Sequence, residues 1–400
     1  MILTLDRNHD QQVGMRTGMV GSSVVRRLIL KDFRSYAHLR MQVDERPVVL
    51  TGANGAGKTN LLEAVSLLAP GRGLRRAQTR ALDRLNGGGA WSIAARVQGA
   101  WGMGEIGTAR STDDGRERRV VRIDGVPASS QAALGERVSV LWLTPAMDRL
   151  FQDGSSERRR FLDRLVLAND PAHMGRVASY GQALRERRRL LRSDRPDRAW
   201  LDAIEARLAG TGVAIAAARR QTVRALTAVL RRDPGRFPRP ELDLDGAVET
   251  WLSDLSALDA EQRFADMLAA NRRRDALSGT TLVGPHRSDL VVRDRSSGMP
   301  AKDGSTGQQK ALLVSICLAE ARRRAGLQQQ LPILLLDEVA AHLDAGRRWD
   351  LFEELTTLGT QAWLTGTDAG VFQPFGRRAQ FFHVNSSELQ PYDATEPSYS

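Results

Sequence analysis

The segment GANGAGKT, from Gly52 to Thr59, constrains the fold more than any other feature of this 400-residue chain. It fits the pattern G-x-x-x-x-G-K-[ST], and it lies between the strand-like segment PVVLTG and the helical pattern NLLEAVSLLA. Glycines at this spacing let backbone N–H groups surround phosphate oxygens at the positive end of a helix. A strand–helix turn with an ordinary surface lysine is the alternative. The residues expected to bind a nucleotide are Gly52, Ala53, Asn54, Gly55, Ala56, Gly57, Lys58 and Thr59.

Two side chains of this segment have specific expected roles. Lys58 is expected to reach the β- and γ-phosphates, and the Thr59 hydroxyl is expected to bind Mg²⁺. The sequence therefore predicts a nucleoside triphosphate with magnesium as cofactors.

The segment PILLLDE, from Pro332 to Glu338, predicts a buried strand that ends in two acidic side chains. Asp337 is placed to hold Mg²⁺ through water, and Glu338 is placed to polarise an attacking water molecule. Many core strands end in an acid, so a core strand with a solvated acidic end is the alternative. A phosphate loop in the same chain favours the catalytic interpretation.

The stretch STGQQKALLVSICLAE, from Ser305 to Glu320, predicts a helix whose first turn carries hydrogen-bond donors. A small hydroxyl residue, a glycine and a glutamine at a helix start suit a γ-phosphate, because the helix dipole adds positive potential there. A simple helix cap is the alternative. The position of this stretch shortly before PILLLDE favours phosphate binding.

Phosphate loop, signature and acid-ended strand in this order resemble the ATP-binding-cassette (ABC) head of the SMC-like ATPases. Five blocks resemble the RecF family of bacterial recombination mediators more specifically: KDFRSYAHL, GKTNLLEAVSLLAPGRGLR, SSERRRFLD, LVGPHRSDL and STGQQK. The resemblance runs from about residue 25 to about residue 385. It implies an α/β fold, namely an ABC-type, SMC-head-like P-loop ATPase domain with an inserted α-helical lobe.

The resemblance also implies residue roles. Glu338 becomes the hydrolytic carboxylate, assisted by Asp337 at the metal and by Lys58. The signature residues are implied to contact the γ-phosphate of a nucleotide held by the opposite subunit, so that ATP binding and dimerisation form one linked equilibrium. The remaining implied nucleotide contacts are Ser305, Gly307 and Gln308 of the signature, Asp344 at the dimer interface, and Arg34 near the base and ribose.

The chain departs from the broader ABC pattern at three places. Where a switch histidine usually follows the last core strand, LTGTD offers Thr365 and Thr367, a loss that fits slow hydrolysis. Gln152 is the candidate for the glutamine of the Q-loop. The alanine of TPAMD, Ala146, stands where the family commonly has an acid.

The sequence divides into five expected parts. Residues 1–23 form a loose N-terminal extension, 24–150 the first half of the ATPase head, and 151–277 an inserted, arginine-rich helical lobe. Residues 278–385 form the second half of the head, and 386–400 a disordered tail. Strands are expected in WSIAARVQG, RRVVRIDGVP, VSVLWLTP, TTLVG and DLVVRD, and DPGRFPRP is expected to break the helical block.

The net charge of +11 suggests a polyanionic partner, although the 58 basic side chains include only four lysines, which points partly to codon bias. Residues 151–232 hold 18 arginines against nine acids and so carry most of this charge. Arginines on solvated helix faces are the alternative to phosphate contacts. Because aromatic residues are sparse there, duplex DNA is favoured over single strands. The candidate DNA contacts are Arg158, Arg159, Arg160, Arg187, Arg188 and Arg189.

Three other side chains have local interpretations. His286 in GPHR is interpreted as a hydrogen-bonded turn residue, with a role for it and Arg287 at DNA or at an interface as the alternative. Cys317 is expected to pack in the core, and a lone cysteine excludes an internal disulfide. With no spanning apolar run and no secretory signal, we expect a cytoplasmic protein without a membrane partner. The resemblance implies that it is nucleoid-associated.

The resemblance implies a function in recombinational repair, replication restart and the response to DNA damage. ATP is implied to close a homodimer on duplex DNA near gaps or single-strand/double-strand junctions, and slow, DNA-dependent hydrolysis to release it. The protein is then implied to help RecO and RecR load RecA onto single-stranded DNA.

Other SMC-like or ABC ATPases are the alternatives to this function. A transporter subunit usually has a switch histidine and leaves the basic insert without a role. A chromosome-organising or break-repair head needs long heptad repeats between its halves. An ATP-dependent nuclease needs a further cluster of metal-binding carboxylates.

Overall fold

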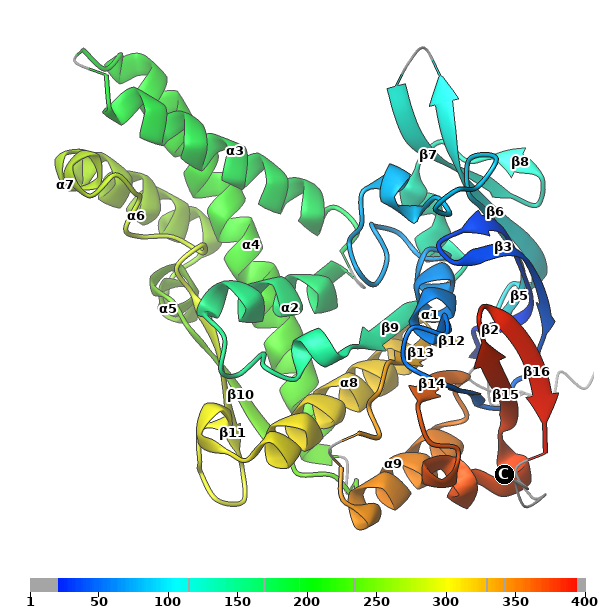
Figure 1. Cartoon of the computed structure of the whole chain (residues 1–400). Coiled ribbons are helices and arrows are strands. Elements are labelled where there is room, and N and C mark those ends of the chain that lie inside the picture. The colour runs from blue at the N-terminus through cyan, green and yellow to red at the C-terminus, as the bar shows by residue number, and fades with distance from the viewer. Residues whose placement is uncertain are drawn as a thin grey trace, which may run out of the picture.

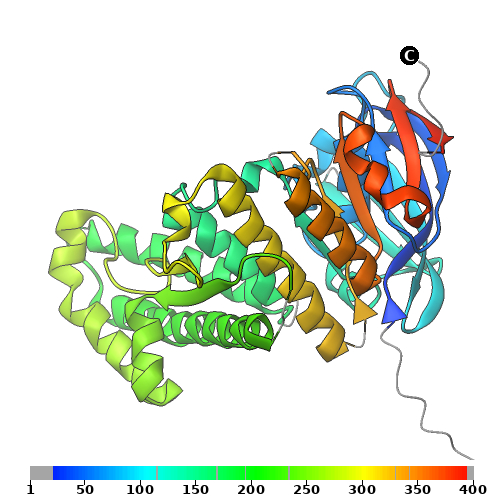
Figure 2. The same cartoon turned by 90° about the horizontal axis from the view of Figure 1, so that it is seen from below.

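The computed structural model describes residues 21–393 except 114–115, 168–169, 194, 233–234, 329 and 342. The described chain forms a head with two large sheets, from which an elongated helical lobe projects (Figures 1 and 2). Residues 1–20 of the expected N-terminal extension lie outside the described part. Its last residues are not loose, because β1 (Gly21–Ser22) pairs in parallel with β12 (Gln330–Leu331).

The first large sheet of the head brings together strands from distant parts of the chain. Its order is β16-β15-β4-β14-β13-β9, and every neighbouring pair is parallel except the hairpin of β15 and β16. Its strands are β4 (Val48–Thr51), β9 (Val140–Leu143), β13 (Ile333–Leu336), β14 (Ala362–Gly366), β15 (Gln380–Asn385) and β16 (Glu388–Tyr392).

These parallel strands are short apolar runs because both faces of the sheet are covered. Successive side chains point to opposite faces. Val48, Leu50 and Leu335 therefore join the core shared with α1 (Lys58–Ser66) and the second sheet, whereas Val49 and Leu334 join the core under the long helices.

The second large sheet is antiparallel and lies over α1. Its order is β3-β2-β5-β6-β7-β8. Its strands are β2 (Val24–Phe33), β3 (Tyr36–Gln42), β5 (Ser92–Gly99), β6 (Gly102–Asp113), β7 (Arg116–Ile123) and β8 (Val126–Pro127). The short helices η1 (Thr79–Leu82) and η2 (Gln131–Glu136) connect these elements. We predicted β5 and β7, but not β6 between them.

Two long helices cover the other face of the parallel sheet. α8 (Thr306–Gln328) and α9 (Ala345–Leu358) lie side by side between the sheet and the lobe (Figure 2), and η5 (Gly370–Arg378) packs against α9. Cys317 of α8 is buried in this core, where burial raises the thiol pKa to about 12. The expectation that it packs in the core is confirmed.

The lobe consists of helices and a two-stranded ribbon. The long helix α4 packs against α3, α5 and α6, with Leu208, Val213 and Phe264 in their shared core. The lobe elements are α2 (Ser155–Leu167), α3 (His173–Leu191), α4 (Arg198–Arg232), β10 (Pro240–Asp245), α5 (Ala247–Asp254), α6 (Ala257–Ala270), α7 (Arg272–Ser278) and β11 (Asp289–Asp294). The remaining short helices are η3 (Pro145–Met147) before the lobe and η4 (Ala301–Asp303) after it.

The lobe extends past residue 277, where we expected the head to resume. β11 pairs antiparallel with β10 along its whole length, so this ribbon belongs to the lobe. The predicted strand TTLVG is wrong, because residues 280–284 form a loop. The main chain of this loop bonds polar groups of the lobe instead of a neighbouring strand. For example, Leu282 N donates to Asp275 Oδ1 at 3.1 Å.

The GPHR segment closes this loop against α3. His286 Nε2 lies 2.9 Å from the Thr281 carbonyl oxygen, and Nδ1 lies 2.9 Å from the Tyr180 hydroxyl. Burial lowers the pKa of His286 to about 4, so the ring is neutral at pH 7 and bonds both neighbours. The structural interpretation of this histidine is confirmed. Arg287 is exposed and bonds the same loop at Thr281 O.

The expected disordered tail contains a strand. β16 pairs with β15 in the register Asn385 with Glu388, so a two-residue loop joins them. Ser386 and Ser387 at its centre have φ values of 47° and 68°. Positive φ at both positions is the geometry of a type I′ hairpin turn. Two serines are an uncommon choice there, which explains why no turn was predicted from the residues. Residues 394–400 lie outside the described part.

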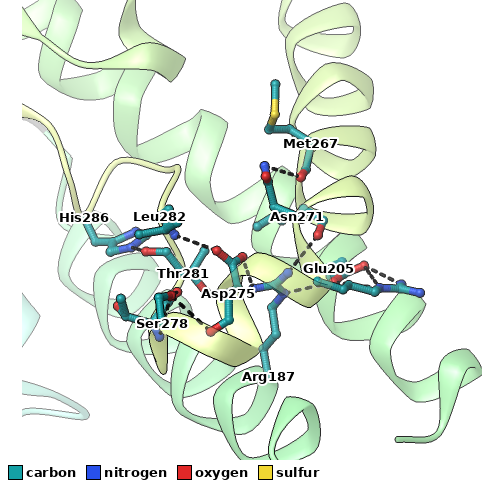
Figure 3. Close-up of polar contacts among 12 residues, drawn as sticks. Arg187, Glu205, Met267, Asn271, Asp275, Ser278, Thr281, Leu282 and His286 are labelled. Atoms are coloured by element: carbon teal, nitrogen blue, oxygen red, sulfur yellow. Dashed lines mark hydrogen bonds and ion pairs between the residues drawn. The ribbon is translucent and has the colours of Figure 1, made fainter.

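Arg187, expected to contact DNA, is completely buried in the lobe. Figure 3 shows its guanidinium between helices, where it donates to Glu205 Oε1 at 2.9 Å, Asp275 Oδ2 at 2.7 Å and Thr281 Oγ1 at 2.9 Å. The Leu268 carbonyl accepts a further bond at 2.8 Å. A cation with these partners cannot reach a phosphate, so this prediction is wrong.

The cluster at the start of α2 needs a similar correction. Arg158 makes two 2.8 Å bonds to the carboxylate of Asp289, and Arg159 donates to Ser288 O at 2.6 Å. Both guanidinium groups therefore fasten α2 to the start of β11 and the residue before it, which leaves them unsuited to phosphate contact. Arg160 is exposed and pairs with Glu157.

Arg187→Met should destabilise the lobe strongly, because two buried carboxylates lose their shared cation. Breaking such a pair costs about 3–5 kcal/mol. Urea unfolding followed by circular dichroism should show an early loss of helical signal. Arg188→Met, at the exposed neighbouring position, is the matched control and should change stability by less than about 0.5 kcal/mol. Equal midpoints for the two variants would show that the buried network contributes no stability.

Candidate functional site

The strand order of the parallel sheet assembles the site. β14 lies between β4 and β13, so the carboxyl ends of these three parallel strands meet at one edge. Gly52 follows β4, Asp337 and Glu338 follow β13, and Thr365 lies near the end of β14. Ligands bind at this edge in open α/β sheets.

The glycines of the phosphate loop are required by its backbone. Gly52, Gly55 and Gly57 have φ values of 143°, 81° and 117°, which L side chains rarely adopt. A Cβ on Gly52 would lie 2.1 Å from the carbonyl oxygen of Val384. The loop therefore curls tightly before α1. No side chain caps α1, so its first amides are available to an anion.

The C-terminal hairpin supports this loop. Ser387 N donates to the Ala56 carbonyl at 2.9 Å, and the hydroxyls of Tyr392 and Thr51 lie 3.1 Å apart. From the other side, the Tyr36 hydroxyl donates to Gly57 O at 3.1 Å. We did not predict these supports. The β-rich composition of QFFHVN, just before the tail, was the available signal.

Lys58 closes the loop on itself. Its Nζ donates to the carbonyls of Gly52 at 2.7 Å and Ala53 at 2.8 Å. The pKa of Lys58 lies below its usual value, because burial lowers it more than the nearby negative charges of Glu338 and Asp337 raise it. An ammonium has three donors, so this cation with two carbonyl acceptors fits a phosphate oxygen as a further partner.

Asp337 joins the loop to the strand ends. Thr59 Oγ1 donates to Asp337 Oδ1 at 2.9 Å, and Thr365 Oγ1 donates to the same oxygen at 2.8 Å. Hydroxyl and carboxylate oxygens are the ligands that Mg²⁺ prefers, so Thr59 and Asp337 fit a magnesium site. Of the two threonines that we considered in place of the switch histidine, the structure brings Thr365 here and leaves Thr367 exposed.

Glu338 has a constrained main chain. Its φ of 51° is unusual for a residue other than glycine, and such strain is typical of functional sites. The N–H donates to Thr365 Oγ1 at 2.9 Å. The end of β13 and the bond to Thr365 therefore fix the main-chain position from which the Glu338 side chain extends.

Arg34 lies beside α1 in an ion pair. Its guanidinium makes two 2.8 Å bonds to the buried carboxylate of Glu63 and donates to Ala81 O at 2.7 Å. Arg75 shares Glu63 at 3.2 Å. Arg34 thus holds η1 against the phosphate-loop helix, and a contact with the base or ribose stays a prediction.

The signature starts α8 with a reciprocal cap. Ser305 N donates to Gln308 Oε1 at 2.8 Å, and Gln308 N donates to Ser305 Oγ at 3.3 Å. This is a capping box, so the local cap that we considered as the alternative does exist. Figure 1 shows that α8 begins beside β11, on the lobe side of the head, away from α1. The structure therefore does not bring Ser305, Gly307 and Gln308 to the phosphate loop of the same chain.

Two other predicted residues lie apart from the loop. Asp344 is exposed and caps α9 by accepting from Arg347 N at 2.8 Å. Gln152 is exposed between η3 and α2. Their expected contacts with nucleotide remain predictions.

A phosphate loop, an acid-ended neighbouring strand and a signature helix on one two-sheet head define an ABC-type ATPase head. The comparisons agree. The model of the RecF/RecN/SMC N-terminal domain family matches residues 24–387. Among solved structures, the recombination mediator protein RecF with ATPrS has a TM-score of 0.80 at 19% identity, covering 93% of this chain and 98% of that one. An Smc head bound to the winged-helix domain of ScpA has a TM-score of 0.53 at 12% identity, covering 92% and 96%.

Relatives that match over nearly their whole length show which family of these ATPases the chain belongs to. The DNA replication and repair protein RecF of Mesorhizobium japonicum is 50% identical over 375 residues, covering 93% of this chain and 99% of the relative. RecF of Rhizobium rhizogenes is 51% identical over 362 residues, covering 90% and 96%. The chain belongs to the RecF family of DNA replication and repair proteins. In the described part of the chain, no helix is long and apolar enough to cross a membrane.

Proposed function

We propose that the protein is an ATP-dependent DNA-binding protein of recombinational repair and replication restart, in which ATP joins two heads on duplex DNA. The observation that carries this proposal is the separation, within one chain, of the phosphate loop at α1 from the start of α8, where the signature lies (Figure 1). A second copy is needed to bring a signature to the loop. Because ATP would then bind between two chains, nucleotide affinity and dimerisation are linked.

Each residue of the proposed site has its own role. ATP with Mg²⁺ supplies the phosphoanhydride bond and the metal charge. Lys58 and the amides of α1 bind and orient the phosphates, while Thr59 and Asp337 hold the metal, Asp337 through water. Glu338 accepts a proton from the water that it orients. Arg34, Asp344 and the signature residues complete the nucleotide contacts.

Hydrolysis is proposed to be weak and stimulated by DNA, so that it times release rather than drives movement. Thr365 replaces an ionisable switch residue by a hydroxyl that binds Asp337 and the Glu338 amide. A hydroxyl cannot take up a proton at neutral pH, so the site lacks one means of stabilising the transition state.

The exposed end of the lobe is the proposed DNA surface. The lobe has a group of exposed arginines at the end of α3, at the start of α4 and on α7, which packs against α3. None of them has a carboxylate partner among the described residues. Such a surface attracts phosphates without reading sequence. We call this set the lobe-tip arginines: Arg185, Arg188, Arg189, Arg192, Arg195, Arg198, Arg273 and Arg274.

The partners follow from the relatives. Two solved relatives are described as RecF of the RecFOR pathway, one with ATP and one with ATPrS. This supports RecR and RecO as partners, RecA loading as the downstream step, gapped duplex or junction DNA as the substrate, and a cytoplasmic, nucleoid-associated location. Another SMC-like head is disfavoured, because α5, α6 and α7 close the lobe where a chromosome-organising head continues into a coiled coil.

Glu338→Gln should bind ATP normally, hydrolyse it poorly and accumulate as an ATP-bound dimer on duplex DNA, because only the proton acceptor is lost. Sedimentation with ATP and DNA, together with phosphate release, measures both effects. Purely monomeric protein under these conditions would contradict the composite site.

Thr365→Val should lower the hydrolysis rate roughly 10- to 100-fold while ATP affinity changes little, because Asp337 and the Glu338 amide lose a shared partner. Thr367→Val, at an exposed position on the same segment, is the control and should behave like the wild type. Equal rates for both variants would exclude Thr365 from the site.

Arg188→Glu with Arg189→Glu should weaken DNA binding and reduce the salt dependence of log K by about 0.9 for each phosphate that the protein no longer neutralises. Arg231→Glu with Arg232→Glu makes the same charge change at the opposite end of α4. Fluorescence anisotropy at several salt concentrations compares the pairs. If both pairs weaken binding equally, the lobe tip is not the DNA surface.

A further inference from the structure

Lysine is rare in this chain, and its four positions differ in environment. Lys31 and Lys302 are exposed, whereas Lys58 and Lys310 are buried. Lys58 belongs to the phosphate loop. Lys310 lies in α8, two residues after Gln308, and none of the roles above involves it. Burying a lysine is costly, so a buried one without an assigned role calls for an explanation.

The ammonium of Lys310 joins three parts of the head. Its Nζ lies 3.1 Å from Asp148 Oδ2 and donates to the carbonyl oxygen of Glu338 at 3.1 Å. Asp148 follows η3, which continues from β9, the neighbour of β13. Lys310 therefore connects the signature helix to the strand end that carries the proposed hydrolytic carboxylate.

The bond to Glu338 acts on a strained residue. Its N–H is held by Thr365, and its carbonyl accepts from Ala341 N at 3.1 Å as well as from Lys310. Glu338 has a φ of 51°, so its side chain projects in one defined direction only if the peptide groups on both sides of it are held in place. Lys310 supplies the only charged side-chain contact to this main chain among the described residues.

We propose that Lys310 is a positioning residue: it fixes the main chain of Glu338 in its own chain and ties that carboxylate to the start of the signature helix. This inference rests on the proposed function. In a dimer, the signature of one chain faces the nucleotide of its partner, while Lys310 behind it acts on the site of its own chain. Movement of α8 at one composite site therefore displaces Glu338 at the other.

Lys310→Met tests the role, because it keeps the apolar stem and removes both bonds. We expect a hydrolysis rate roughly 10- to 100-fold lower, with affinity for a fluorescent ATP analogue changed less than about threefold. Lys302→Met, at an exposed lysine just before the signature, is the matched control and should match the wild type. A Lys310→Met rate equal to that of the control overturns the proposal.

Asp148→Asn separates positioning from simple ion pairing. It removes the charge partner but leaves Lys310 able to bond Glu338, so it should lower thermal stability while the hydrolysis rate falls less than about threefold. A rate as low as that of Lys310→Met would show that the ion pair, not the carbonyl bond, is responsible. If Lys310→Met does not fold, Lys310→Arg serves instead: it keeps the pair with Asp148 and should still hydrolyse slowly, and a wild-type rate overturns the proposal.

Mixed dimers test whether the action is within one chain. In an equimolar mixture of Lys310→Met and Glu338→Gln chains, each mixed dimer has one site without the carboxylate and one with a misplaced Glu338, so hydrolysis should stay low. If Lys310 served the partner's site through the signature, the mixed dimer would regain one intact site, and recovered hydrolysis would overturn the proposal. Sedimentation of the wild type with ATP tests the dimer separately. Without dimers, the proposed function fails, while the single-chain rates still decide the role of Lys310.

Discussion

One oxygen of the Asp337 carboxylate connects the two distant halves of the head. It accepts a hydrogen bond from Thr59 at the start of α1 and another from Thr365 on β14. Both bonds depend on the strand order. β14 lies directly between β4 and β13, so the ends of all three strands are within reach of Asp337. In a different strand order, the phosphate loop, the oxygens of Thr59 and Asp337, and Glu338 would not lie together.

The arginines of the lobe serve two different purposes. Arg219 illustrates the internal one: it makes bonds of 2.8 and 3.0 Å to the carboxylate of Asp163 and donates to Pro285 O at 2.6 Å. Burial raises the pKa of Asp163, but bonds from His173 and Arg219 outweigh it, so the pKa lies below its usual value. Such arginines build the lobe and tie the GPHR segment to it. The lobe-tip arginines are exposed instead, and in the described part of the chain none of them pairs with a carboxylate.

The sequence predicted what depends on local spacing. The glycines of the loop, the acid-ended strand and the helix of the signature are readable because each motif is contiguous. The burial of Arg187 was not, since its partners Glu205 and Asp275 lie on other helices and follow no local pattern. The choice of Thr365 over Thr367 depended on where β14 ends, because Thr365 lies inside the strand and Thr367 follows its last residue, Gly366. The β15–β16 hairpin was missed because its turn uses two serines at positive φ rather than glycine or asparagine.

The central strand of the head has consequences for how the protein is made. Both sheet neighbours of β4 lie near the other end of the chain, in β14 and β15. During synthesis the lobe can complete its own core first, because its helices and ribbon are close in sequence, whereas β4 has no sheet partner until β14 and β15 have been made. A nascent or prematurely terminated chain therefore has a folded arm but no nucleotide pocket. Until β14 and β15 are made, the apolar strand β4 is exposed to chaperones and proteases.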